Sequence, residues 1–329
     1  MKKVVCALMV LIVLLIVSVS SAEEETMFYQ TEKGRYQYRI LQDGTAMIVA
    51  YQGSAATLVI PAEFDGIKVS CIWKNAFYLS DVENVTISEG ITGLYEDAFC
   101  ACRSLESVTL PDSIQMLQNN PFTSCYSLKE MNISPDHPTL EIVDGALINK
   151  EDKRLICCLF GSLPADYEIP DGIEIIGKKA FHFCQNLTRI TIPGSVKVID
   201  PEAFTQCFQL VSVTISEGVT EIKEEAFRDC DNLLSITFPK TLTIIGEKAF
   251  YGCEKLPFVM IPENVTHIRA QAFGACSELQ AVILPKSLIS IGDNAFGKFT
   301  IPGEYYVPQD SYALSYCIEN GIPFHIIAD

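Results

Sequence analysis

The chain has 329 residues, of which 49% are hydrophobic, and a formal net charge of −17 at pH 7. Nucleic acid and anionic membrane surfaces are therefore poor partners, because they carry the same sign of charge. We interpret the excess of acid as keeping a long exposed surface soluble.

The segment from Met1 to Ala22 has the pattern of a secretory signal peptide. Two lysines precede an apolar run over residues 4–17, and small residues follow as far as Ala22. The run is short for a membrane span, and no later segment approaches about 20 consecutive apolar residues. The alternative for this segment is an uncleaved anchor helix. We exclude residues 1–22 from the fold and expect a secreted or cell-surface protein that is not inserted in the membrane after cleavage.

An Ala-Phe pair recurs along the chain, and from Phe181 to Phe296 it returns every 23 residues five times in succession. A fixed period of roughly 20–29 residues indicates a repeat solenoid, in which each unit buries its apolar face against its neighbours. The step from Phe122 to Phe181 is longer, and it spans two periods and an inserted segment.

One unit reads L-x-x-I-x-I-P-x-x-V-x-x-I-x-x-x-A-F-x-x-C-x-x, as in residues 187–209. Its Leu-x-x-Ile-x-Ile segment alternates like a half-buried strand, and Pro ends the strand because it has no N–H for the ladder. Successive strands would stack in parallel about 4.8 Å apart. The sequence therefore predicts a ribbon of parallel strands with one face open to a partner.

Phenylalanine and cysteine each hold one position of the unit, and we expect both columns to point into the core. The rings would fill the wide end of each coil, and the thiols would pack as small hydrophobes with S–H groups near turn carbonyls. Disulfides between neighbouring coils are the alternative, although stacked Cβ atoms about 4.8 Å apart exceed the usual spacing. Trp73 is also expected in the core. The columns comprise Phe181, Phe204, Phe227, Phe250, Phe273 and Phe296, and Cys102, Cys125, Cys184, Cys207, Cys230, Cys253 and Cys276.

No catalytic or metal-binding motif is evident. Gly-x-Ser-x-Gly, His-Glu-x-x-His and P-loop spacings are absent from the sequence. A metal site needs convergent ligands, and neither Cys100-Ala101-Cys102 nor Cys157-Cys158 has a histidine nearby. We expect no cofactor, no metal and no enzyme activity, with an enzyme of unrecognised type as a distant third class.

The unit resembles that of the BspA-type leucine-rich repeat family, and Ile176-Gly177, Ile245-Gly246 and Ile291-Gly292 carry the family's Ile-Gly pair. The likeness covers nearly all of residues 35–329. It implies a right-handed coil of stacked parallel β-strands in secreted or surface proteins, some of which are adhesins that bind host matrix proteins or other cells.

The resemblance also implies the domain boundaries. Residues 23–56 would form an N-terminal extension and capping hairpin with a turn at Asp43-Gly44. Residues 57–299 would form the solenoid, with an inserted β-hairpin at 144–158. Residues 300–329 would form a helix and strand cap, in which Asp310 or Ser311 begins the helix and Gly321 ends it.

One end of the predicted strand face is apolar. The outward residue of each strand is Thr in most coils but becomes Met260 and then Ile283 near the C-terminus. Such a cluster can mark a binding site, and Glu254 and Glu278 flank it. The candidate protein-binding residues, called here the apolar patch, are Leu234, Pro257, Phe258, Met260 and Ile283.

Each surface hypothesis has an alternative. For the apolar patch, the alternative is that the segment 305–310 folds back and covers it. The inserted hairpin is a second binding candidate, and its alternative is a tolerated surface insertion. For the whole protein, the leading hypothesis is a module that binds host extracellular or cell-surface proteins. Its alternative is a non-catalytic structural spacer or self-assembling component of a cell envelope or matrix.

Overall fold

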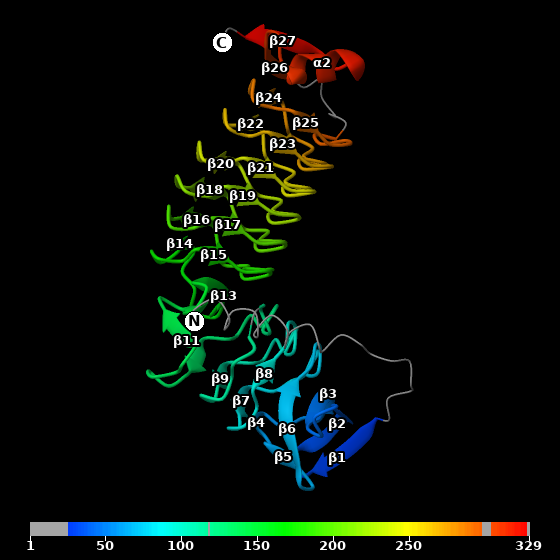
Figure 1. Cartoon of the computed structure of the whole chain (residues 1–329), viewed down its shortest axis with the longest axis vertical. Helices are drawn as coiled ribbons and strands as arrows, with labels where there is room; N and C mark the ends of the chain where they lie inside the picture. The colour runs from blue at the N-terminus through cyan, green and yellow to red at the C-terminus, as the bar shows by residue number, and fades with distance from the viewer. Residues whose placement is uncertain (1–25, 118, 298–303, 328–329) are drawn as a thin grey trace, which may run out of the picture.

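The computed structural model describes residues 26–117, 119–297 and 304–327. The predicted signal peptide lies outside the described residues. Coils of one repeat unit each stack along the long axis of an elongated molecule, with β1 (Met27–Thr31) near one end and β27 (Phe324–Ile327) at the other (Figure 1). This arrangement confirms the predicted solenoid.

Each coil places one strand, built from its Leu-x-x-Ile-x-Ile segment, on a common face that we call the strand face. Alternation sets its orientation: Ile190 and Ile192 are buried, whereas Thr191 between them reaches the surface. Pairing is parallel, with partners one repeat unit apart, as between Thr191 and Thr214. The strand face comprises three four-stranded sheets. They are β4 (Thr57–Ile60), β7 (Asn84–Ile87), β9 (Ser107–Thr109) and β10 (Glu130–Asn132); then β14 (Asp166–Glu168), β16 (Arg189–Ile192), β18 (Ser212–Ile215) and β20 (Ser235–Thr237); then β22 (Phe258–Met260), β24 (Ala281–Ile283), β26 (Glu304–Pro308) and β27.

A second sheet, which the sequence analysis did not predict, forms at the Val-x-x-Ile segment. Each regular coil gives it only two residues, and the isoleucine points into the core. Gly246 follows one such isoleucine because a Cβ there would lie 2.5 Å from the carbonyl carbon of Lys223 in the preceding coil. In chain order its strands are β11 (Leu140–Val143), β12 (Ala146–Asn149), β13 (Arg154–Cys158), β15 (Ile175–Ile176), β17 (Val198–Ile199), β19 (Glu221–Ile222), β21 (Ile244–Ile245), β23 (His267–Ile268) and β25 (Ser290–Ile291).

The Ala-Phe segment forms the third side of each coil as a tight turn. In the coil around Phe227, Glu225 and Asp229 both adopt left-handed backbone angles, with φ of 55° and 54°. The backbone of this turn is hydrogen-bonded to the next coil: Phe227 N donates to the Ala249 carbonyl at 2.7 Å. The Phe rings stack inside this turn, and from Phe204 to Phe296 successive ring planes lie within 6° of parallel.

Both ends carry the predicted caps. The N-terminal cap is an antiparallel sheet of β1, β2 (Gly34–Ile40) and β3 (Ala46–Gln52), continued by β6 (Ile67–Ile72), which pairs with β5 (Glu63–Phe64) and β8 (Gly93–Leu94). The predicted hairpin is β2–β3, and β1 is an additional strand. At the other end, helix α2 (Tyr312–Glu319) begins at Ser311, whose Oγ accepts a hydrogen bond from Leu314 N at 3.1 Å. Ser311 is therefore the helix cap.

The inserted hairpin, β12–β13, lies inside the molecule and divides the core in two. Alternate residues face opposite ways: Ile148 and Leu155 join the C-terminal core, whereas Leu147 and Ile156 join the N-terminal core. All four side chains are buried. The expectation of a tolerated surface insertion is therefore wrong, because the strands form an internal wall between two halves of the solenoid. The turn over residues 150–153 is exposed, and binding through it stays a prediction.

Trp73 is also placed differently from the expectation. It is 37% exposed and packs beside Tyr95, with ring centroids 4.5 Å apart. Strand β6 does not alternate to its end: Val69, Cys71 and Ile72 are all buried, and the pairing with β3 shifts register between Val69 and Cys71. This irregularity reverses the alternation, so Trp73 faces outward.

Candidate protein-binding face

The apolar patch lies on the strand face, around β20, β22 and β24. Leu234, Phe258 and Met260 are 50%, 42% and 57% exposed, whereas Pro257 and Ile283 are half-buried. Met260 and Ile283 are direct neighbours in the parallel register of β22 and β24. The structure thus brings the outward-facing residues of two coils together, with Leu234 on the coil before them.

Elsewhere the same outward column is mostly polar. Thr86, Thr214 and Thr237 occupy it in other coils, and Val59, in the first coil, is an isolated apolar exception that is 58% exposed. Single exposed apolar side chains are ordinary on protein surfaces, whereas adjacent ones mark interaction sites. The outward-facing side chains of β22 and β24 are therefore apolar and adjacent, whereas those of the rest of the strand face are mostly polar.

Sequence reasoning missed one neighbour of the apolar patch. Strand β26 pairs in parallel with β24 and places Tyr306 next to Ile283. Tyr306 in turn stacks on His325 of β27, with ring centroids 5.2 Å apart. The segment Tyr305-Tyr306-Val307-Pro308 has the I-x-I-P pattern of a repeat strand, and aligning it as a further coil would have found this contact.

The same pairing contradicts the alternative that residues 305–310 fold back over the apolar patch. Strand β26 extends the sheet edge to edge, in register with Ala281 to Ile283. A strand hydrogen-bonded beside β24 cannot also lie on the outer face of β24. The alternative is wrong because the segment has repeat-strand character and completes the stack.

Pro257 interrupts the strand face beside the apolar patch. In the coils before and after, the equivalent residue donates its N–H to the previous coil, from Leu234 to Val211 and from Gln280 to Pro257, at 2.9 Å each. Proline has no N–H to donate. Strands β20 and β22 are not paired, although β21 and β23 on the second sheet are. The strand face is therefore split between Leu234 and Phe258.

The split leaves core-facing side chains accessible. Ile236 and Phe238 are half-buried, whereas their equivalents one coil earlier, Val213 and Ile215, are buried. Phe238 contacts Phe250 edge-on, with centroids 5.6 Å apart. Apolar surface at this point therefore comes from both the outer face and the opened edge of the core.

Two hollows lie away from the apolar patch. One, of about 640 Å³, runs over β19 to β25 and is lined by mixed charges that include Lys223, Glu247 and Arg269. The other, of about 330 Å³, is lined by four glutamates. Within the described residues, no group of three or more His, Cys, Asp or Glu side chains is arranged to hold a metal ion. We assign neither hollow a ligand.

The cysteine column packs as free thiols in the core. Every described cysteine is unpaired, and all but the half-buried Cys100 are buried. In most repeats the thiol donates to the Phe carbonyl of the previous coil, as from Cys230 to Phe204 at 3.3 Å. Burial raises the pKa of the Cys276 thiol to about 12, so this group is not a nucleophile at neutral pH. Residues of the predicted columns are at most 7% exposed: Phe181, Phe204, Phe227, Phe250, Phe273, Phe296, Cys102, Cys125, Cys184, Cys207, Cys230, Cys253 and Cys276.

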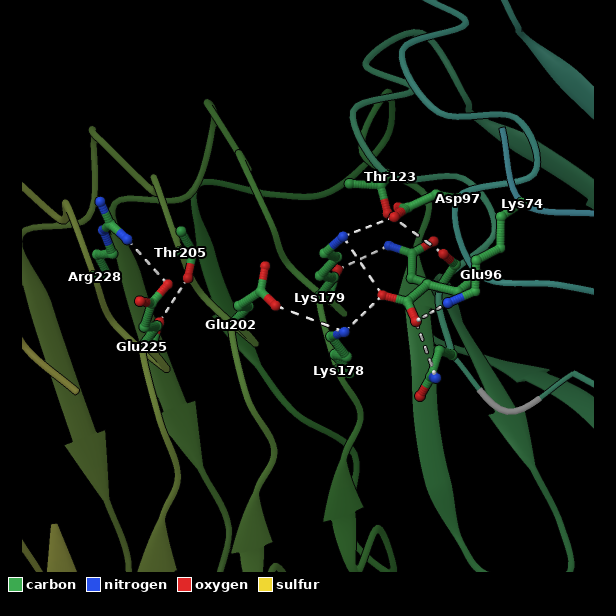
Figure 2. A network of polar contacts seen from close by, with 12 residues as sticks. Lys74, Glu96, Asp97, Thr123, Lys178, Lys179, Glu202, Thr205, Glu225 and Arg228 are labelled. Atoms are coloured by element: carbon green, nitrogen blue, oxygen red, sulfur yellow. Dashed lines mark hydrogen bonds and ion pairs between the residues drawn. The ribbon is translucent and has the colours of Figure 1, made fainter. Parts of the chain in front are cut away.

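A polar network joins the two halves where the hairpin interrupts the repeat (Figure 2). Lys178 contacts Glu96 at 2.9 Å, and Lys179 contacts Asp97 at 2.7 Å. Buried Asn120 donates from its Nδ2 to the Lys179 carbonyl at 2.8 Å. We call these five residues the polar joint. It links coils that lie far apart in the sequence.

Burial and neighbouring charges shift the pKa of Glu96 in opposite directions. Burial alone would raise the pKa of its carboxyl group, but the hydrogen bond from Lys178 and the charges of Lys178, Lys179 and Lys74 lower it below the ordinary value of 4.5. The carboxylate is therefore ionised at neutral pH, which suits a group whose role is to hold the two halves together.

The family model of the BspA type leucine rich repeat region matches residues 58–149, 162–273 and 197–318 in six copies. The chain therefore belongs to this family of repeat solenoids. The comparison with curated proteins gives no match. No helix among the described residues is both long enough and apolar enough to cross a membrane.

Several leucine-rich repeat proteins are among the solved structures similar to this chain. One from Eubacterium ventriosum is 16% identical, covers 84% of this chain and 96% of its own, and has a TM-score of 0.49. The pneumococcal vaccine antigen PcpA is 15% identical over 92% of this chain and 98% of its own, with a TM-score of 0.47. A leucine rich cell surface protein from Faecalibacterium prausnitzii is 20% identical over 92% and 99%, with a TM-score of 0.42.

Proposed function

We propose that this protein is secreted or displayed at the cell surface and binds another protein through the apolar patch. The partner class is a host extracellular or cell-surface protein, which makes the protein an adhesin. One observation carries the proposal: Phe258, Met260 and Ile283 form a contiguous apolar cluster on a face that is otherwise mostly polar.

Two features of the structure support this use of the face. The side chains stand on paired strands, so they are held in fixed positions and lose little freedom on binding. Glu254 and Glu278 beside them are exposed, which favours a partner with apolar side chains and a basic rim. We further propose that the protein acts without catalysis, since the buried thiols offer no nucleophile.

The test is binding of residues 23–329 to a panel of extracellular-matrix and cell-surface proteins. The variant Phe258→Asp/Met260→Asp places two carboxylates on β22 at exposed positions. Its matched control is Thr57→Asp/Val59→Asp, which makes the same change at the equivalent positions of β4, at the other end of the face.

We expect wild type and control to bind alike, and the β22 variant to lose binding while keeping its circular dichroism and thermal midpoint. Equal binding by the two variants would contradict the assignment to the apolar patch. If wild type binds no protein of the panel, the adhesin proposal fails and the structural spacer becomes the better explanation of the fold.

A further inference from the structure

Strand β27 is the outermost described strand of its sheet and lies at one end of the molecule (Figure 1). It pairs in parallel with β26, and no other strand of the described chain pairs with its second edge. Such an edge presents a row of backbone N–H and C=O groups that a further strand can satisfy.

The core is also open at this tip. Tyr305 and Val307 of β26 point into the core and are 1% and 0% exposed. In register with Val307 is Ile326, which therefore points to the same side, yet it is 56% exposed. The helix α2 packs against β25 and β26 and leaves this side chain uncovered. Its own Ile318 is 62% exposed. A terminal cap normally presents a polar outer surface.

Charge selects the occupant of this edge. Between Gly321 and Ile327 there is no acidic residue and no lysine, and His325 is the only ionisable side chain. Two copies of a chain with a net charge of −17 repel each other over most of their surfaces. Strand β27 carries no carboxylate of its own, and the Glu304 carboxylate on the adjacent strand β26 lies 4.0 Å from the His325 ring nitrogen, so charge repulsion is smallest along this edge.

At the opposite end of the described chain, a charged side chain lies against the edge strand β1. Phe28 of the edge strand β1 is 52% exposed, but the guanidinium group of Arg35 lies over its ring, 3.7 Å from the centroid. A charged side chain over an edge strand hinders the addition of another strand. The difference between the two ends favours pairing of β27 with β27 of a second copy over pairing of β27 with β1.

We propose that two copies of this protein pair β27 with β27, antiparallel, about a two-fold axis at His325. This register places Phe324 opposite Ile326 of the second copy on the core side, and covers both isoleucines at once. Opposed residues of an antiparallel pair share a face of the sheet, so both cores lie on the same side.

The dimer joins two four-stranded sheets into one and carries both apolar patches on a single continuous face. A two-fold contact uses the same surface on both copies and closes on itself, so the assembly ends at two. It is therefore distinct from an extended self-assembling spacer. The proposal stands on the tip of the molecule and does not depend on the proposed binding of a host protein.

The first experiment measures the mass of residues 23–329 by light scattering over a dilution series, for wild type, Ile326→Lys and Val59→Lys. We expect a wild-type dimer and an unchanged Val59→Lys dimer. Ile326→Lys sets like charges close together across the axis and should raise the dimer dissociation constant at least about tenfold. Wild type that stays monomeric throughout, or Ile326→Lys that dimerises like wild type, would overturn the proposal.

A second experiment tests the register with His325→Cys under mild oxidation. Opposed Cβ atoms in an antiparallel pair lie about 4.5–5.5 Å apart, close enough for a disulfide after a small adjustment. We expect a covalent dimer from His325→Cys and none from Thr214→Cys, an exposed control in mid-solenoid. A dimer that His325→Cys fails to cross-link would refute this axis. Phe258→Asp/Met260→Asp should still dimerise, so failure of one proposal is separable from failure of the other.

Discussion

The two halves of the solenoid use the same repeat with different regularity. In the N-terminal half, the Phe77 and Phe99 planes are tilted by 15°, and the Phe99 and Phe122 planes by 25°. In the C-terminal half, from Phe204 onward, the tilt is at most 6°. The C-terminal steps are all equal, whereas the step from Phe77 to Phe99 is one residue shorter. Step length alone does not set the tilt, because the steps from Phe99 to Phe122 and from Phe181 to Phe204 are both 23 residues long, yet these ring planes are tilted by 25° and 14°.

The halves also differ in what their turns hydrogen-bond to. In the regular stack, Phe204 N donates to the carbonyl of Ala226 in the next coil at 2.7 Å. At the end of the N-terminal half, Phe122 N donates instead to the side chain of Asn120, at 2.8 Å. The Asn120 side chain thus replaces the missing next coil. The halves are coupled through the polar joint and the two-sided hairpin rather than through a continuous ladder.

The largest expected effect comes from Phe227→Ala, which opens a cavity between two parallel rings of the C-terminal half. We expect a loss of about 3–5 kcal/mol in the free energy of unfolding. Urea unfolding is followed by circular dichroism for the whole chain and by fluorescence of Trp73, the single tryptophan, for the N-terminal half. Because the hairpin belongs to both cores, both midpoints should fall together.

Its control is Phe208→Ala, a half-buried ring on the outer side of the turn, for which we expect less than about 1 kcal/mol. If Phe227→Ala leaves the urea midpoint of Trp73 fluorescence unchanged, the halves unfold independently, which would contradict the coupling inferred from the hairpin.

A smaller effect, of about 1–3 kcal/mol, is expected from Asn120→Ala, which leaves the Phe122 N–H without a partner and removes one of two hydrogen bonds to the Lys179 carbonyl, the other coming from His182 N. The same two probes should now give separate midpoints, since the polar joint is weakened while each core is intact. Asn120→Asp keeps the acceptor for Phe122 and removes the donor to Lys179, so its loss should be intermediate. Coincident, unshifted midpoints in Asn120→Ala would show that the hairpin alone couples the halves.

The smallest effect, about 1 kcal/mol, is expected from Glu96→Gln, because solvent screens a cluster that includes the half-exposed Lys74. The lowered pKa of Glu96 sets the sign with pH. Its stabilisation is present above the carboxyl group's pKa in the unfolded chain and is lost as pH falls through the lower pKa of the folded state.

Urea midpoints measured at decreasing pH should therefore fall more steeply in wild type than in Glu96→Gln. The control is Glu106→Gln, whose ion pair with Lys129 is about half exposed on both sides. It should follow the wild-type curve. If the urea midpoints of wild type and Glu96→Gln fall identically with decreasing pH, the Glu96 carboxylate does not stabilise the polar joint.

The predictable part of the structure depends on local patterns. The repeat period, the alternation of Leu-x-x-Ile-x-Ile and the Asp43-Gly44 turn each lie within a short window, and the strands, stack and caps follow from them. The apolar patch was predicted by extending the same alternation to Phe258 and Met260. The error at Trp73 arose where the first coil departs from the repeat.

By itself, the sequence determined which side of the regular strands is buried and where Phe and Cys stand in the regular coils, because these depend on spacing along one unit. Only the tertiary structure decided that the hairpin divides the core, that Pro257 splits the strand face, and that β26 extends it. Each of these depends on contacts between coils, such as that of Asn120 with Lys179, which lie on either side of the hairpin in the sequence. A period read along one chain does not reveal which coils become neighbours once the repeat is interrupted.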